Sequence, residues 1–175
     1  MSSCQFIHLE VYARVAGSTK KGGHNLDSIV AEAERHPSAC LHVTKPRPPS
    51  LLYGFMPSKA AEKASAWAEH AFDSRGRRLR RDGLCLLAGV ISLEQQRIED
   101  WPAFRQATLK WLIDFFGDRL VSVIEHTDEE NPHIHFYCVA HARERFECLH
   151  PGRKAAQEVR NAGQLKGRGN SSALP

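Results

Sequence analysis

Three histidines in the second half of the chain have a spacing that suits one metal ion. His133 and His135 are two residues apart in an apolar stretch, so on a β-strand both side chains leave the same face while Ile134 points the other way. Their Cβ atoms are then roughly 6 to 7 Å apart, a span that one ion can bridge. A turn after His126 would bring a third imidazole beside them. The pattern H-x6-H-x-H predicts a facial site with positions open for water or a phosphate oxygen.

The polar segment between these histidines also supplies carboxylates. Asp128 and Glu129 are the nearest ones to the expected site, and each could orient an imidazole or act as a fourth ligand. Three nitrogen ligands favour a borderline cation such as Mn²⁺, Co²⁺, Ni²⁺ or Zn²⁺ over Mg²⁺. An isolated His-x-His pair is usually an ordinary polar sheet face. The third histidine and the flanking carboxylates make metal binding the better interpretation.

The elements that position these residues follow from the hydrophobic patterns. Strands are predicted over 5–15, 84–91, 120–124 and 133–140, and helices over about 26–33, 58–72, 101–116 and 151–161. Asn25 or Asp27 can cap the first helix. Strands separated by helices and followed by a closing hairpin predict an α+β domain with a central antiparallel sheet of four to five strands. We expect helices on one face of this sheet and the site on the other.

The composition is that of a single globular domain. The chain has 175 residues, of which 42% are hydrophobic and 25% charged. It contains no apolar run near the roughly 20 residues of a membrane helix, which excludes a membrane-spanning protein. The start of the chain does not resemble a secretory signal, and the five cysteines include no C-x-x-C pair. We therefore expect a reducing, cytoplasmic location.

The charge is distributed unevenly along the chain. The formal net charge is +4, with an excess of Lys and Arg over 1–82 and 141–175 and an excess of Asp and Glu over 83–140. The two basic ends of the chain suit the binding of a polyanion. The acidic middle would repel that polyanion unless it holds a cation. This distribution favours nucleic acid and metal together. We expect residues 1–162 to form the catalytic domain and 163–175 to be a disordered tail or a truncated continuation.

At this point the sequence resembles the Mob/Pre (MobV-type) plasmid mobilization relaxases of the HUH endonuclease superfamily. The specific part of the resemblance is the third motif, His126-x-Asp128-Glu129-x-x-Pro132-His133-x-His135. An N-terminal strand, a Gly/Lys loop ending in His24-Asn25, and the segment Leu51-Leu52-Tyr53-Gly54 agree with it. The resemblance covers most of 5–155 and implies a ferredoxin-like or RRM-like palm.

The family implies an enzyme that nicks one DNA strand at a plasmid transfer origin. In such enzymes the protein stays joined to the 5′ phosphate and leaves a free 3′ hydroxyl, with a divalent ion, here Mn²⁺ first, stabilising charge on the phosphate. The implied partners are single-stranded or supercoiled plasmid DNA and conjugation coupling proteins. Glu129 is placed among the catalytic residues. The residues expected to contact DNA are Lys20, Lys21, Asn25, Arg75, Arg77, Arg78, Arg80 and Arg81, although a solvated turn is the plain alternative for the arginines.

Two residues compete for the role of nucleophile. The first motif of the family supplies a histidine followed by asparagine, which His24 and Asn25 match. The chain departs from the motif two residues later, where Asp27 replaces an arginine and the nearest basic residue is Arg35. Tyr53 is the alternative, because tyrosine is the usual nucleophile in other HUH families. His24 could also be a plain loop or DNA-contacting residue.

Other functions share the same motif. A rolling-circle replication initiator or an HUH transposase would use the same ion site with a tyrosine nucleophile. A non-cleaving, metal-stabilised module that binds single-stranded DNA belongs to a different class of protein. A metal-dependent phosphohydrolase is a further alternative. A tyrosine adduct would indicate the initiator or transposase, and DNA binding without strand scission would indicate the binding module. Turnover of small phosphoesters would indicate the phosphohydrolase.

Overall fold

The computed structural model describes residues 6–15, 25–73 and 75–168. Within them a five-stranded antiparallel sheet has the order β1-β3-β5-β4-β2, which places β5 at its centre. The strands are β1 (Phe6–Ala13), β2 (Ser50–Gly54), β3 (Leu84–Ser92), β4 (Leu120–His126) and β5 (His133–Cys138), and the helices are α1 (Leu26–Ala33), α2 (Pro57–His70), α3 (Trp101–Phe116) and α4 (Pro151–Arg168). The predicted α+β class and antiparallel sheet are confirmed.

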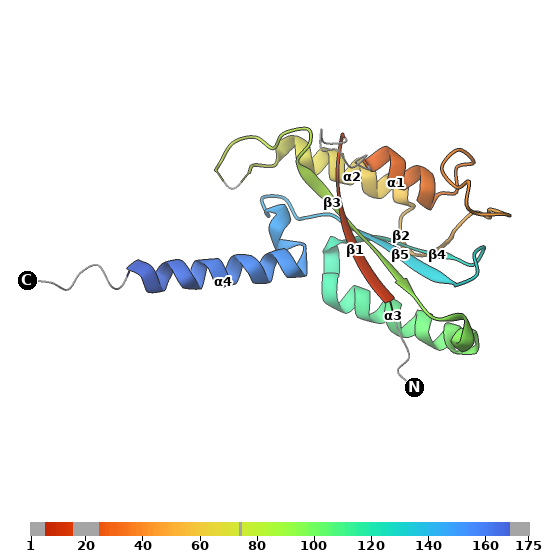
Figure 1. Cartoon of the computed structure of the whole chain (residues 1–175). Coiled ribbons are helices and arrows are strands. Elements are labelled where there is room, and N and C mark those ends of the chain that lie inside the picture. The colour runs from red at the N-terminus through yellow and green to blue at the C-terminus, as the bar shows by residue number, and fades with distance from the viewer. Residues whose placement is uncertain (1–5, 16–24, 74, 169–175) are drawn as a thin grey trace, which may run out of the picture.

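Helices cover both faces of the sheet. Figure 1 shows α1 and α2 on one side and α3 on the other. Leu86 and Ala88 of β3 pack in the core beneath α1 and α2, whereas Leu87 and Ile91 pack against α3. The expectation of helices on one face and an open site on the other is therefore wrong. The central strands are apolar on both sides, and each side must be removed from water.

The edge strand β2 was not predicted as a strand. It pairs with β4, with a bulge between Leu51 and Tyr53. Gly54 ends it with a φ of 72°, and a Cβ added there would lie only 2.1 Å from the Val121 carbonyl oxygen. Glycine is required at this close approach of two strands. Five residues with little alternation give no strand pattern by themselves, so pairing with β4 decides their conformation.

The first and last helices differ in how firmly they are tied to the domain. Asn25, one of the two caps that the sequence offered, caps α1 by accepting a hydrogen bond from the Ser28 amide at 2.9 Å. In contrast, α4 extends away from the sheet (Figure 1) and continues to Arg168, past the predicted domain boundary at residue 162. That boundary stays a prediction. No helix in the described ranges is long and apolar enough to cross a membrane.

Candidate metal centre

The three motif histidines meet on the α1 side of the central strands. His126 and His133 are directly paired across β4 and β5, and His135 follows on β5. The ring centroids are 5.1 Å apart for His126 and His133, 4.8 Å for His126 and His135, and 5.0 Å for His133 and His135. One nitrogen from each ring lies within 4.8 Å of the others. This spacing allows one ion to contact all three.

Neighbouring groups fix the orientation of each imidazole. A carbonyl oxygen only accepts, so Nε2 of His126 donates to Ala33 at 2.9 Å and Nδ1 of His133 donates to Asn131 at 3.0 Å. Nδ1 of His135 lies 3.3 Å from the Tyr137 hydroxyl. One nitrogen of each ring is thus engaged by the protein, and the other keeps its lone pair for a ligand. Hydrogen-bond partners on the ring nitrogen that does not bind the metal are typical of metal-bound histidines.

One atom tests directly whether this cluster suits an ion. Nδ1 of His126 is buried and has no hydrogen-bond partner. Leaving a buried polar nitrogen unsatisfied costs about 1–3 kcal/mol. A cation coordinated by this nitrogen would remove that cost. The donor set and the orphaned nitrogen both fit a borderline divalent metal.

Burial keeps the imidazoles of His126 and His135 neutral, which metal binding requires. Desolvation, followed by the positive charge of Arg35, lowers the pKa of His126 to about 4. Desolvation and the neighbouring His126 hold the pKa of His135 well below its usual range. A neutral imidazole presents a lone pair, whereas a protonated one does not. His126 and His135 therefore offer lone pairs to a cation at neutral pH.

Arg35 is the residue of this site whose role the sequence did not indicate. It follows α1 with a φ of 60° and has a buried side chain. Its Nε and Nη2 donate to the two Asp128 oxygens at 3.0 and 2.8 Å, and Nη2 also donates to Glu129 at 2.6 Å. Burial acts to raise the pKa of Asp128, but hydrogen bonds from Arg35 and from the Arg47 amide lower it overall. In the sequence, the adjacent carboxylates Asp128 and Glu129 were the feature that could have indicated a buried cation nearby.

The two predicted carboxylates have different surroundings. Both oxygens of Asp128 bind Arg35, so its carboxylate orients that guanidinium. Glu129 is more exposed, and its Oε1 lies 3.8 Å from Nε2 of His133. Glu129 borders a pocket of about 420 Å³ that His133, His135 and Phe6 also line. Of the two, Glu129 is the carboxylate that a molecule in this pocket can reach.

Of the two candidate nucleophiles, the structure describes Tyr53 but not His24. His24, Lys20 and Lys21 lie outside the described residues. Asn25 caps α1 and Ala33 is its last residue. Asn25 therefore lies roughly 12 Å along the helix axis from the Ala33 carbonyl that His126 contacts. The Asn25 side chain is engaged in the helix cap.

The tyrosines have little access to the histidine centre. Tyr53 pairs with Val123, whose side chain packs in the core on the α3 side, and paired residues share a face. The register therefore puts Tyr53 on the face opposite the histidines. Tyr12 and Tyr137 are buried, and desolvation raises the pKa of both hydroxyls. A tyrosine with a raised pKa is a poorer nucleophile.

The arginine-rich segment forms a tight turn. Phe72 and Arg78 form an antiparallel bridge, and Asp73 accepts hydrogen bonds from the Arg75 amide and the Arg77 side chain. Arg80 pairs with Asp82. This arrangement agrees with the predicted hairpin tip, and the role of the arginines in binding DNA stays a prediction.

Comparison with solved structures identifies the fold. The MobM relaxase domain (MOBV; Mob_Pre) bound to a 26-nucleotide pMV158 oriT DNA superimposes with a TM-score of 0.58 at 12% identity, over 98% of this chain and 95% of that one. Two Mn-bound structures of the same domain with 22-nucleotide oriT DNA, one of them carrying a 3′ thiophosphate, have TM-scores of 0.55 at 14% and 15% identity, over 97% of this chain and 94% of theirs. No family model and no curated protein matches the sequence. The chain therefore has the fold of these relaxase domains.

Proposed function

We propose that this chain is a metal-dependent DNA relaxase of the Mob/Pre type. It would nick one strand at a plasmid transfer origin by transesterification and retain the 5′ phosphate covalently. The observation that carries the proposal is the group of three imidazole nitrogens within 4.8 Å of one another on a relaxase fold. Structural neighbours described as Mn-bound and DNA-bound support Mn²⁺ as the ion and oriT DNA as the partner.

The protein groups of this centre suit phosphoryl transfer. A divalent ion held by His126, His133 and His135 would act as a Lewis acid toward the charge that grows on the phosphate oxygens. Glu129 borders the same pocket, and we assign it the role of accepting the proton of the nucleophile. Arg35 holds that carboxylate in place through its 2.6 Å contact.

We propose His24 as the nucleophile. Its imidazole nitrogen would bond to phosphorus and give its N–H proton to Glu129, while the bond from phosphorus to O3′ would break. The 3′ oxygen would then leave as a hydroxyl by taking that proton from Glu129. The phosphoramidate would conserve the energy of the bond for later rejoining. The position of Tyr53 on the opposite face supports His24 over tyrosine.

The metal centre is tested with His133→Ala. We expect loss of Mn²⁺ binding by calorimetry and at least a thousand-fold slower nicking of supercoiled plasmid carrying the matching origin, because one of three ligands and its charge stabilisation are lost. His36→Ala, which changes an exposed histidine bonded to Ser38, is the matched control and should nick normally. Undiminished nicking by His133→Ala would refute the proposed mechanism.

The nucleophile is tested by trapping the covalent intermediate. A suicide oligonucleotide that is cleaved at the origin should leave an adduct on His24, located by peptide mass spectrometry, and His24→Ala should form none. Tyr53→Phe should still form the adduct at the normal rate. An adduct on Tyr53 would reassign the nucleophile and favour a replication initiator or a transposase.

The same assays separate the remaining alternatives. Retained Mn²⁺ and single-strand binding without scission would indicate a non-cleaving DNA-binding module. Action on plasmid DNA would place the protein in the cytoplasm, with conjugation coupling proteins as further partners. The described cysteines, Cys40, Cys85, Cys138 and Cys148, are free thiols, which suits that compartment.

A further inference from the structure

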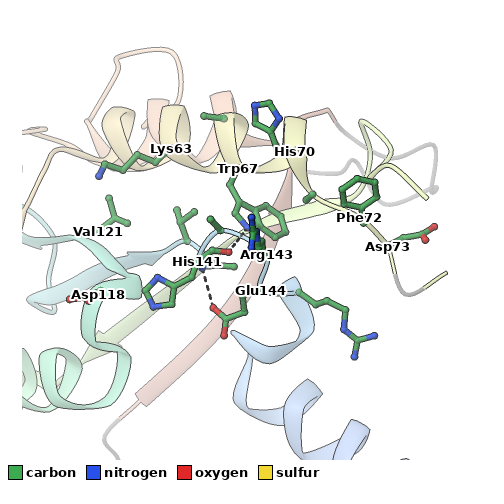
Figure 2. A pocket seen from close by; sticks show the side chains of 16 residues that line it. Lys63, Trp67, His70, Phe72, Asp73, Asp118, Val121, His141, Arg143 and Glu144 are labelled. Carbon is green, nitrogen blue, oxygen red and sulfur yellow. Dashed lines mark hydrogen bonds between the residues drawn. The ribbon is translucent and has the colours of Figure 1, made fainter. Parts of the chain in front are cut away.

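A second and larger pocket lies at the other end of the β4–β5 hairpin. It has a volume of about 850 Å³ and is bounded by α2, the segment 72–73 and the loop 140–145. Figure 2 shows Trp67 extending from α2 toward His141 and Arg143 across this space. Val121 lines it near the start of β4, whereas His126 ends that strand, so the two sites are roughly 15–20 Å apart.

The lining offers aromatic rings held in fixed positions. Trp67 donates from its indole nitrogen to the His141 carbonyl at 3.0 Å, and its ring lies 6.4 Å from that of Phe146. Phe72 lies at the border and is 57% exposed. Val121 and Val139 contribute further apolar surface. Such a lining suits a flat, partly apolar group.

The pocket is lined by three carboxylates and three cations, which are Asp73, Asp118, Glu144, Lys63, Arg143 and Arg145. Arg77 pairs with Asp73, and Arg119 pairs with Glu144. The charge of Asp118 also acts to raise the pKa of Arg119. Among the described residues, no carboxylate pairs with Arg143 or Arg145, which also line the pocket.

The arginine-rich turn extends this positive charge. Arg78 is bridged to Phe72, so their side chains share a face beside the pocket. The guanidinium groups of Arg75 and Arg81 likewise pair with no carboxylate in the described part of the chain. The pocket is therefore an aromatic hollow with unpaired guanidinium groups at its border.

We propose that this pocket receives an unpaired base of the bound DNA while Arg78, Arg143 and Arg145 contact the flanking phosphates. The inference rests on the proposed function for its choice of DNA as the ligand. An aromatic ring offers stacking to any base, and guanidinium groups recognise phosphates at fixed geometry. A neutral ligand would leave these cations uncompensated. Because the pocket is separate from the histidine centre, it would hold DNA away from the point of cleavage.

The test uses two fluorescent hairpin oligonucleotides with the same stem, one with a loop of four thymidines and one with a loop of four abasic sites. Binding is measured by anisotropy in EDTA, so that the metal centre takes no part. We expect Phe72→Ala to weaken binding of the thymidine probe about ten-fold and of the abasic probe less than two-fold. Phe115→Ala on α3, where the ring is 53% exposed, is the matched control and should change neither.

Two further measurements test the phosphate contact and the base contact separately. Arg143→Gly, which suits the φ of 69°, should weaken both probes to the same extent, because it removes a phosphate contact. Ultraviolet cross-linking of a 5-iodouracil loop should map to Trp67 or Phe72. Equal binding of the two probes, or Phe72→Ala behaving like Phe115→Ala, would overturn the inference while leaving nicking intact. Base-dependent binding without any nicking would overturn the proposed function alone.

Discussion

The two ends of the β4–β5 hairpin are built on opposite principles. At one end, three imidazoles and the Arg35–Asp128 pair are removed from water. At the other end, an apolar hollow is bordered by cations that remain in solvent. The first arrangement suits a small, charged ligand held at fixed geometry, and the second suits a larger group held by area and long-range charge. One hairpin can thus support two kinds of recognition.

An arginine–carboxylate pair at each end makes the contrast quantitative. Arg35 and Asp128 have side chains that are 3% and 2% exposed, whereas Arg119 and Glu144 are 36% and 16% exposed. Arg35 and Asp128 share two hydrogen bonds, and Arg119 and Glu144 share three. The buried pair has the fewer mutual hydrogen bonds, and burial should nevertheless determine the cost of breaking each pair.

The largest effect on stability is expected for Arg35→Ala. Removing the guanidinium leaves the buried Asp128 charge uncompensated, which should lower the free energy of unfolding by about 3–5 kcal/mol. Urea denaturation followed by circular dichroism measures this. The double variant Arg35→Met with Asp128→Leu should recover much of the loss, since no buried charge is left. A loss below 1 kcal/mol for Arg35→Ala would show that water reaches the pair.

A smaller effect is expected from acid in the metal-free protein. The pKa of His126 is about 4 when folded, below its usual value near 6.5, so the unfolded chain takes up the proton first. Stability should therefore be full above about pH 6.5 and decline as the pH falls toward 4. Between pH 7 and 5 the loss from His126 alone is about 2 kcal/mol.

The check is urea denaturation in EDTA across this pH range. His126→Asn should give a shallower dependence on pH than the unmodified protein, while His36→Ala should keep the full slope. Identical slopes for His126→Asn and the unmodified protein would assign the acid sensitivity to other groups.

The smallest effect is expected at the pocket end. Hydrogen bonds from Arg119 lower the pKa of Glu144, so this pair contributes at neutral pH and its contribution is lost as the pH falls through that pKa. Because solvent screens the pair, Arg119→Ala should cost under about 1 kcal/mol at neutral pH. Thermal unfolding compared with Arg35→Ala provides the measurement. Equal costs at the two ends would contradict the difference in burial.

Local patterns predicted much of the fold. The alternation around His133 and His135, the long apolar run of β3 and the Asn25 cap all depend on near neighbours, and each is present in the structure. The short strand β2 and the position of α3 depend on which surfaces remain to be covered. Those features were missed because no local pattern encodes them.

The sequence by itself determined the ligand types and their spacing, since side-chain alternation on a strand requires only neighbouring residues. Only the tertiary structure decided that Arg35 lies against Asp128 and Glu129, more than ninety positions further along the chain. It also decided that the Ala33 carbonyl orients His126 and that α2 and the loop 140–145 enclose a second pocket. These contacts arise from packing the helices on the sheet, where burial and charge pairing select partners far apart in sequence.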